Sequence, residues 1–199
     1  MRKALALGVS EGVQGFAGLP NVVHEVSAVR DIEGGKSLLN DEFSRARFKS
    51  ELQIEPYNLV HIASHGEFGS DPSRTFVLAF DGRLTMDDLE RDIKYGKYRE
   101  SALELLTLSA CQTAAGDDRA ALGLAGIALK SGARSALATL WSVNDRSAGD
   151  LVLSFYRALQ NENLSKAHAL QAAQREMLQD PVFGHPSYWA PFLLIGNWL

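Results

Sequence analysis

Two side chains in this sequence have the chemistry of a nucleophile and its acid–base partner, and each directly follows an apolar run. His65 follows Leu59–Ser64 and precedes Gly66, while Cys111, the single cysteine, follows Leu105–Ala110. An unassisted thiol with a pKa near ~8.5 is only slightly ionised at neutral pH, and a neighbouring imidazolium favours the reactive thiolate. The same imidazole can later protonate a leaving amine. The pair predicts attack by sulfur on an acyl carbon.

Each residue alone also has a structural interpretation. A lone buried cysteine is more often a small core hydrophobe, and a lone histidine at a strand end is more often structural. The order strand–His–Gly, then strand–Ala–Cys, roughly 50 residues apart, favours the catalytic interpretation. Gly66 lets a substrate carbonyl approach its N–H, which with the N–H of Cys111 predicts an oxyanion hole. His61 lies on the same strand face as His65 and is interpreted as a hydrogen-bonded core histidine.

Apolar, β-branched segments alternate with helical patterns, which predicts an α/β fold with a mostly parallel central sheet of about six strands. In such sheets catalytic groups gather at the carboxyl ends of the strands, so neighbouring strands would bring His65 and Cys111 to one edge. Asp81–Gly82 predicts a tight hairpin turn. The predicted strands are Ala4–Val9, Leu59–Ser64, Phe76–Phe80, Leu103–Ser109, Ala133–Leu140 and Phe192–Gly196.

Helical periodicity and capping residues predict the covering layers of this sheet. Asn40 or Asp41 is the expected N-cap of the second helix, and Thr85–Asp88 resembles a capping box. The predicted helices are Val22–Ile32, Phe43–Gln53, Thr85–Ile93, Leu122–Ser131 with Gly132 as C-cap, Asp145–Gln160 and Ser165–Leu178.

Composition excludes several classes of function. The net charge of −4 disfavours a nucleic-acid or anionic-membrane surface, and no apolar run approaches the roughly 18 residues of a membrane span. One cysteine excludes an internal disulfide, and we expect a cytoplasmic location. The histidines lack metal-ligand spacing, so neither a metal nor another cofactor is expected. A nucleotide-binding domain is disfavoured because Gly12–Gly18 lacks both GxGxxG and a P-loop lysine. The N-terminal apolar stretch Met1–Val9 is interpreted as a core strand rather than a signal peptide.

Several motifs together resemble the CHAT domain, a caspase-like domain related to separase and the caspases, of the clan CD type of cysteine peptidase. The resemblance implies a caspase-like three-layer α/β/α sandwich over residues 1–199, with His65 and Cys111 as the catalytic dyad. Family members commonly carry an upstream segment and tetratricopeptide (TPR) repeats, both of which we expect this chain to lack. We therefore expect it to work with a TPR-type regulatory partner or domain. The motifs are His61–Gly66, Gly82–Leu89, Leu108–Gly116, Gly132–Asp145 and His185–Phe192.

Substrate preference is expected to depend on the segment Trp141–Asp145. It is similar to a separase segment whose aspartate binds an arginine before the scissile bond, so Asp145 would contact a basic side chain bidentately. Alternatively Asp145 caps the helix that begins there, and the two roles could coexist. Cleavage after aspartate would need converging arginines, for which Arg134 and Arg146 are available.

The sequence therefore predicts a cysteine endopeptidase that cleaves a protein or peptide substrate after Arg or Lys, under the control of a partner or sensor domain. The short segment Gln112–Ala120 predicts no maturation into two subunits. The alternative is a catalytically silent caspase-like scaffold or signalling module.

Overall fold

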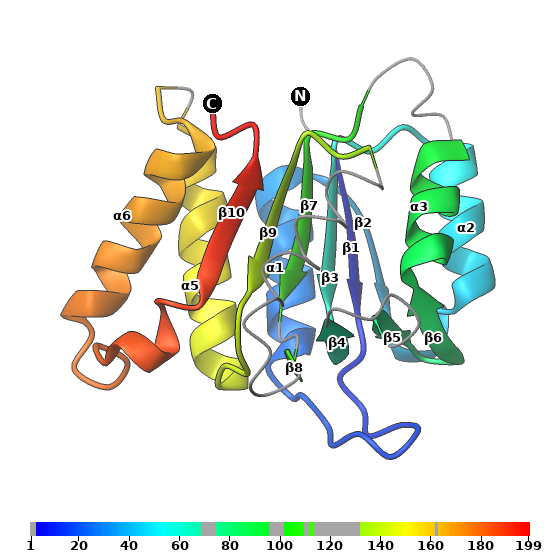
Figure 1. Ribbon diagram of the computed structural model, residues 1–199, viewed down its shortest axis with the longest axis horizontal. Helices are drawn as coiled ribbons and strands as arrows, with labels where there is room; N and C mark the ends of the chain where they lie inside the picture. Colours follow the sequence, from blue (N-terminus) through cyan, green and yellow to red (C-terminus); the bar gives the residue numbers. More distant parts are fainter. Residues whose placement is uncertain (1–2, 69–74, 96–101, 110–111, 114–131, 162) are drawn as a thin grey trace.

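A mixed sheet is the centre of the fold in the computed structural model, which describes residues 3–68, 75–95, 102–109, 112–113, 132–161 and 163–199. Within these residues the sheet has six strands in the order β10-β9-β7-β3-β1-β2 (Figure 1). All neighbours are parallel except β10, which runs antiparallel to β9. The strands are β1 (Ala4–Gly8), β2 (Gly35–Leu39), β3 (Leu59–Ala63), β7 (Leu105–Ser109), β9 (Ser135–Thr139) and β10 (Phe192–Gly196).

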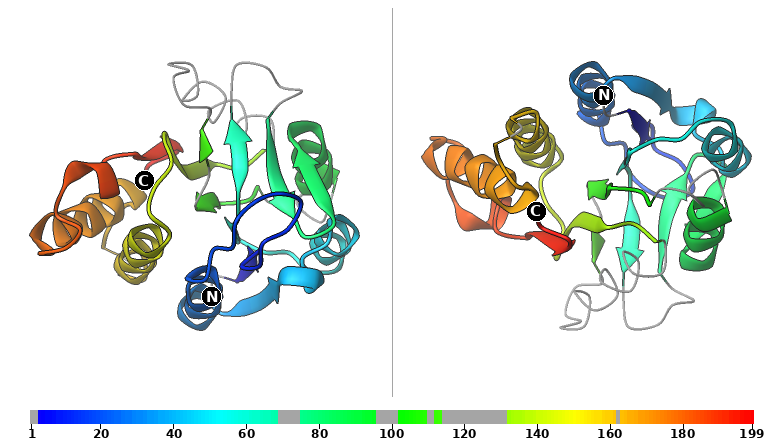
Figure 2. Two further views of the ribbon diagram at one scale, coloured as in Figure 1. Left: turned by 90° about the horizontal axis from the view of Figure 1, so that it is seen from below. Right: turned by 90° about the horizontal axis from the view of Figure 1, so that it is seen from above.

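Helices cover both faces of this sheet (Figure 2). On one side lie α1 (Val22–Glu33), α5 (Asp145–Leu159) and α6 (Lys166–Gln179), and on the other lie α2 (Arg45–Ile54) and α3 (Met86–Tyr95). Strand β1 shows why its sequence is apolar throughout: Leu5 and Leu7 enter one core, whereas Ala4 and Ala6 enter the other. Each fully buried leucine contributes about 1.5–3 kcal/mol to folding. The predicted three-layer α/β/α architecture is confirmed.

The strands predicted for the central sheet are largely confirmed, with two differences. β1, β3, β7, β9 and β10 begin and end within about two residues of their predicted bounds. The predicted strand Phe76–Phe80 exists as β5 (Phe76–Ala79), but it belongs to a second sheet. The edge strand β2 was not predicted, because its sequence begins with Gly35 and Lys36 and only one of its residues, Leu38, is fully buried.

The second sheet lies at the carboxyl ends of the central strands, at the lower edge in Figure 1. Its order is β6-β5-β4-β8, with β4 (Gly66–Phe68), β6 (Gly82–Thr85) and β8 (Gln112–Thr113) joining β5. A tight hairpin turn connects the antiparallel strands β5 and β6, as predicted, but its loop residues are Phe80 and Asp81 rather than Asp81 and Gly82, because Gly82 already pairs with Ala79. The Asp81 carboxylate accepts from the Arg45 main-chain N–H at 2.9 Å, which attaches the turn to the start of α2.

The helix starts follow local capping chemistry. Ser44, rather than the predicted Asn40 or Asp41, caps α2 by accepting from the Arg47 N–H at 3.2 Å, because Asn40 and Asp41 lie in the short 3₁₀ helix η1 (Asn40–Glu42). At α3 the predicted capping box is confirmed, since the Thr85 main-chain N–H donates to the Asp88 carboxylate at 3.0 Å. Ser165 caps α6, and a second 3₁₀ helix, η4 (Pro186–Tyr188), precedes β10.

One predicted helix, Leu122–Ser131, lies outside the described residues. Gly132, its predicted C-cap, has φ +73°, the left-handed backbone that such a cap uses. Among the helices that are described, none has the length and apolar character needed to cross a membrane.

Gly35 is predicted to be required for the β1–β2 pairing. Its φ is +107°, and a Cβ built there would lie 2.1 Å from the main-chain oxygen of Ala4. Gly35→Ala should therefore destabilise the protein by about 3 kcal/mol or more in urea unfolding, through strain and overlap with main-chain atoms.

Gly132→Ala is the matched control. Gly132 also has positive φ, but a Cβ there would meet nothing within 4 Å in the described structure. This control should cost only about 1–2 kcal/mol of left-handed backbone strain. Equal losses in the two variants would refute the overlap argument.

Candidate active site

The main chain at His65 passes from the central sheet into the second sheet. Ser64 follows β3, and its hydroxyl donates to the main-chain oxygen of Leu78 in β5 at 2.7 Å. The Leu78 N–H in turn donates to the His65 main-chain oxygen at 2.8 Å. Gly66 then begins β4, where it is buried opposite Val77. The backbone of His65 is thus fixed on both sides by hydrogen bonds to β5.

The His65 ring is held by the loop that follows β1. Its Nε2 lies 2.8 Å from the main-chain oxygen of Ala17, and the Phe16 ring packs with a centroid distance of 5.0 Å. Phe16 also contacts Phe76 edge-to-face at 6.2 Å. The other ring nitrogen, Nδ1, is buried and has no hydrogen-bond partner among the described residues. One nitrogen is therefore used for orientation, and the other keeps its capacity for proton transfer.

This loop is itself anchored at two points. The Ser10 N–H donates to the Asn40 side-chain oxygen at 2.8 Å, and Gln14 Nε2 donates to the main-chain oxygen of Phe80 at 3.0 Å. Gln14 and Gly15 both have positive φ and form a tight turn, closed by the Phe16 N–H, which donates to the main-chain oxygen of Val13 at 2.9 Å. Phe16 and Ala17 were not identified from the sequence. Their signal was the glycine-rich stretch that we considered for nucleotide binding.

Cys111 lies outside the described residues, but the chain is described on both sides of it. Before it, β7 pairs in parallel with β3, with Ser109 opposite Ala63. After it, β8 pairs in parallel with β4, with Gln112 opposite Glu67. The residues that flank Cys111 in sequence are therefore paired with the residues that flank His65.

Asp145 is the first residue of α5 rather than its N-cap. Asn144 caps α5, because its side-chain oxygen accepts from the N–H groups of Arg146 and Ser147. The interpretation that Asp145 caps its own helix was wrong. Its Oδ2 instead accepts from the main-chain N–H and the side-chain Nδ2 of Asn21, both at 2.8 Å, at the start of α1. Its Oδ1 is buried without a hydrogen-bond partner in the described structure.

The two arginines considered for recognition of an acidic residue do not converge. Arg134 precedes β9 at the amino end of the parallel strands and pairs with Glu104 at 3.1 Å. Arg146 lies at the other end, in the first turn of α5, near Asp150 at 3.8 Å. Because the two arginines lie at opposite ends of the parallel strands, they cannot form one anion site.

His61 is a buried, hydrogen-bonded core residue, as predicted. Its Nε2 lies 3.1 Å from a carboxylate oxygen of Glu25 on α1, and its Nδ1 lies 3.5 Å from the Tyr156 hydroxyl on α5. That hydroxyl donates to the Thr107 hydroxyl at 2.8 Å, and burial raises the pKa of Tyr156. These contacts join α1, α5 and the two central strands in one polar cluster.

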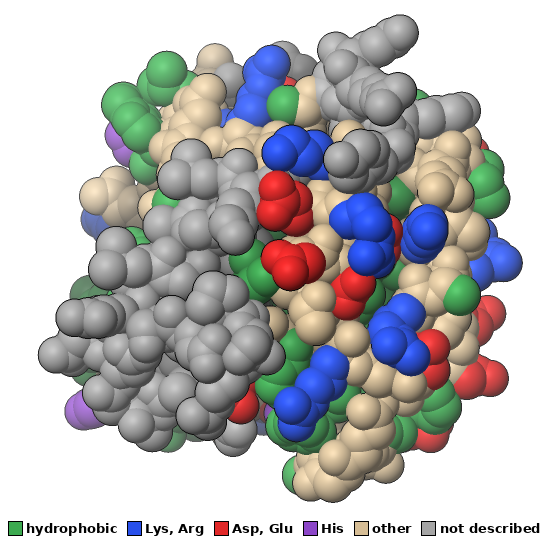
Figure 3. All heavy atoms as spheres, turned by 45° about the vertical axis from the view of Figure 1, so that its right-hand side comes forward, with side chains coloured by type: hydrophobic (Ala, Val, Ile, Leu, Met, Phe, Trp, Pro, Cys, Tyr) green, Lys and Arg blue, Asp and Glu red, His purple; other side chains and the backbone are tan. Residues whose placement is uncertain are grey.

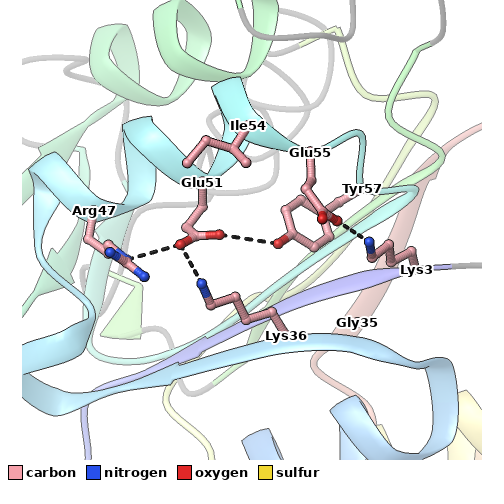
Figure 4. A pocket seen from close by; sticks show the side chains of 8 residues that line it. All are labelled: Lys3, Gly35, Lys36, Arg47, Glu51, Ile54, Glu55 and Tyr57. Carbon is pink, nitrogen blue, oxygen red and sulfur yellow. Dashed lines mark hydrogen bonds and ion pairs between the residues drawn. The ribbon is translucent and has the colours of Figure 1, made fainter.

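Figure 4 shows a hollow of about 350 Å³ lined in part by Lys3 and Gly35. These residues lie at the amino ends of β1 and β2, whereas His65 follows the carboxyl end of β3. Within it Glu51 accepts from Lys36 Nζ at 2.6 Å and pairs with Arg47 at 3.0 Å. Burial and the neighbouring Glu51 carboxylate raise the pKa of Tyr57. Because these charges are paired with one another inside the hollow, we assign it no part in the active site.

The face formed by α2 and α3 carries acidic and basic side chains side by side (Figure 3). Arg91 pairs with Asp88 at 2.7 Å, and Lys94 pairs with Glu90 at 3.4 Å along α3. This face therefore presents ion pairs rather than a basic surface. Within the described ranges, no group of three or more His, Cys, Asp or Glu side chains could hold a metal ion.

Comparisons with known proteins agree with this architecture. The family model described as "CHAT domain" matches residues 2–197. Human tetratricopeptide repeat protein 28 is 36% identical over 69 residues, which are 35% of this chain and 3% of that protein.

Among solved structures, the fold resembles a secreted C11 cysteine protease from Bacteroides thetaiotaomicron, determined in complex with an irreversible peptide inhibitor. The TM-score is 0.53 at 10% identity, and the match covers 90% of this chain and 60% of that one. This likeness shows that the fold is caspase-like.

The contact with Ala17 predicts the tautomer of His65. A carbonyl oxygen only accepts, so the neutral ring must carry its hydrogen on Nε2 and leave Nδ1 as the acceptor. Ring-¹⁵N NMR, at a pH where the imidazole rings are neutral, should show this single tautomer for His65. The exposed His24 should show a mixture of both tautomers. A predominantly Nδ1–H ring at His65 would contradict the described geometry.

Proposed function

The chain belongs to the CHAT domain family, and on this basis we propose that it is a cysteine endopeptidase in which Cys111 is the nucleophile and His65 its acid–base partner. The observation that carries the proposal is the pairing described above. Ser109 lies opposite Ala63, and Gln112 lies opposite Glu67. Pairing on both sides supports a short distance between the chain at Cys111 and the chain at His65. The caspase-like fold is a second support.

In the proposed reaction, His65 Nδ1 takes the proton of the Cys111 thiol, since Nε2 is engaged with Ala17. The sulfur attacks the peptide carbonyl carbon, and the oxygen takes the π electrons. The N–H groups of Gly66 and Cys111 donate to this oxyanion. When the C–N bond breaks, the imidazolium gives its proton to the amine.

Water then completes the cycle. It attacks the thioester carbon and loses a proton to His65. Collapse of the second tetrahedral intermediate breaks the C–S bond, releases the carboxylic acid and returns the sulfur as a thiolate beside the imidazolium. No external oxidant, reductant or cofactor enters this scheme.

We further propose that Asp145 recognises a basic side chain at P1, the residue before the scissile bond. Its Oδ1 is a buried acceptor without a hydrogen-bond partner among the described residues, and a buried unpaired carboxylate oxygen is costly. A guanidinium or ammonium group from a substrate would satisfy it. The resemblance to the separase segment supports the same role.

The substrate, the regulatory partner and the cellular compartment are also part of the proposal. We expect a protein or peptide substrate and control by a TPR-type partner or linked domain, which the similarity to a tetratricopeptide repeat protein supports. The single cysteine would remain a free thiol in a reducing, cytoplasmic compartment.

The dyad is tested first by thiol chemistry, which needs no activating partner. We expect iodoacetamide to alkylate Cys111 at pH 7, with a rate that falls about tenfold or more in His65→Ala as the thiolate is lost. Peptide cleavage should fall about 10²–10⁴-fold in the same variant. His24→Ala, on the exposed face of α1, is the matched control and should change neither rate. A thiol that reacts equally in all three proteins would favour the scaffold alternative.

The acidic P1 site is tested with Asp145→Asn, which keeps the shape of the side chain and removes its charge. Losing one charge-assisted hydrogen bond should lower kcat/KM for a P1-Arg peptide about 10–100-fold. A P1-citrulline peptide, which has the shape of arginine without its charge, should lose little.

Asp150→Asn is the control, because Asp150 lies one turn further along α5 near Arg146 and is exposed. It should leave both substrates unchanged. Equal losses for arginine and citrulline in Asp145→Asn would exclude the recognition role.

A further inference from the structure

The two oxygens of the Asp145 carboxylate differ in their hydrogen bonding. Oδ2 accepts from both the main-chain N–H and the side-chain Nδ2 of Asn21, each at 2.8 Å. A carboxylate oxygen offers about two lone-pair sites, so Asn21 fills the capacity of Oδ2. Oδ1 is buried and has no hydrogen-bond partner among the described residues. The acceptor capacity that remains on Asp145 is therefore concentrated on one oxygen.

Asn21 also belongs to the segment that holds His65. It lies four residues after Ala17, whose main-chain oxygen contacts the His65 ring. Four residues span at most about 14 Å when fully extended. One segment thus contacts both the histidine and the acid, and it limits how far apart they can lie. This upper limit is compatible with a single substrate residue that reaches from one to the other.

We propose that Asn21 is a specificity-determining positioning residue, which restricts Asp145 to an end-on, single-oxygen contact so that arginine and lysine are accepted almost equally at P1. The inference rests on the proposed function and deepens it. It also replaces the bidentate contact expected from the sequence, because a bidentate guanidinium needs both carboxylate oxygens. An ammonium group needs one oxygen, and so does one arm of a guanidinium.

The test compares kcat/KM for peptides that differ only in P1: arginine, lysine and citrulline. In the wild-type chain both basic peptides should be cleaved well above citrulline, and within about fivefold of each other, since both donate to a single oxygen. Asn21→Ala keeps the main-chain N–H but frees one lone pair of Oδ2. The arginine-to-lysine ratio should then rise about tenfold, because a bidentate contact becomes available.

Controls separate this role from a general effect on the helix. Asn144→Ala removes the cap of α5 without touching the Asp145 oxygens, so it should lower both basic rates together and keep their ratio. Asn21→Gly also keeps the main-chain N–H, and glycine is tolerated at a helix N-cap. It should repeat the change in ratio if Asn21→Ala does not fold.

The results that would refute the role of Asn21 differ from those that would refute the peptidase proposal. A wild-type preference for arginine above about 50-fold, or an unchanged ratio in both Asn21 variants, would refute the inference. If no peptide is cleaved, the same three peptides are measured for binding by fluorescence anisotropy. Binding of the basic pair over citrulline, with the same response to Asn21→Ala, would support the inference without the peptidase. Equal binding of all three would overturn it.

Discussion

Parallel pairing between β3 and β7 is the constraint on which the rest of the site depends. It aligns Ala63 with Ser109, so that both strands leave the central sheet at the same level. The short sheet beyond them continues this alignment with Glu67 opposite Gln112. A shift of one residue in either pairing would turn alternate side chains to the other face. The polar residues His61 and Thr107 oppose this shift, since they lie opposite each other in the two strands and both contact the buried Tyr156 hydroxyl.

The loop after β1 is the second organising element, because it serves residues that are distant in sequence. Its Ala17 oxygen orients His65, and Asn21 at its end binds Asp145. Its own shape depends on Asn40 and on the main chain of β5. A segment without regular secondary structure thus connects the end of β3 to the start of α5. The proposed substrate recognition and the proposed proton transfer would therefore depend on one piece of backbone.

The sequence predicted most of the fold because apolar runs and capping residues are local signals. It did not predict β2, whose pairing with β1 depends on the left-handed backbone at Gly35 rather than on side-chain pattern. For the candidate site, His65 and Asp145 were predicted from residue type and position, and their roles stay predictions. The role of Ala17 could not be identified, since a main-chain carbonyl leaves no mark in a sequence. The partner of Asp145 depends on the packing of α1 against α5, which no spacing along the chain encodes.

Helix α1 is attached to its neighbours at successive turns. Asn21 binds Asp145, and one turn later Glu25 reaches His61 in β3 and lies beside Gly149 of α5. If α1 shifted its register by one residue, these groups would move by about 1.5 Å along the helix axis and turn by about 100° around it. Both attachments would break together. The buried Glu25–His61 contact therefore sets the axial position of the helix, and through Asn21 the position of the Asp145 carboxylate.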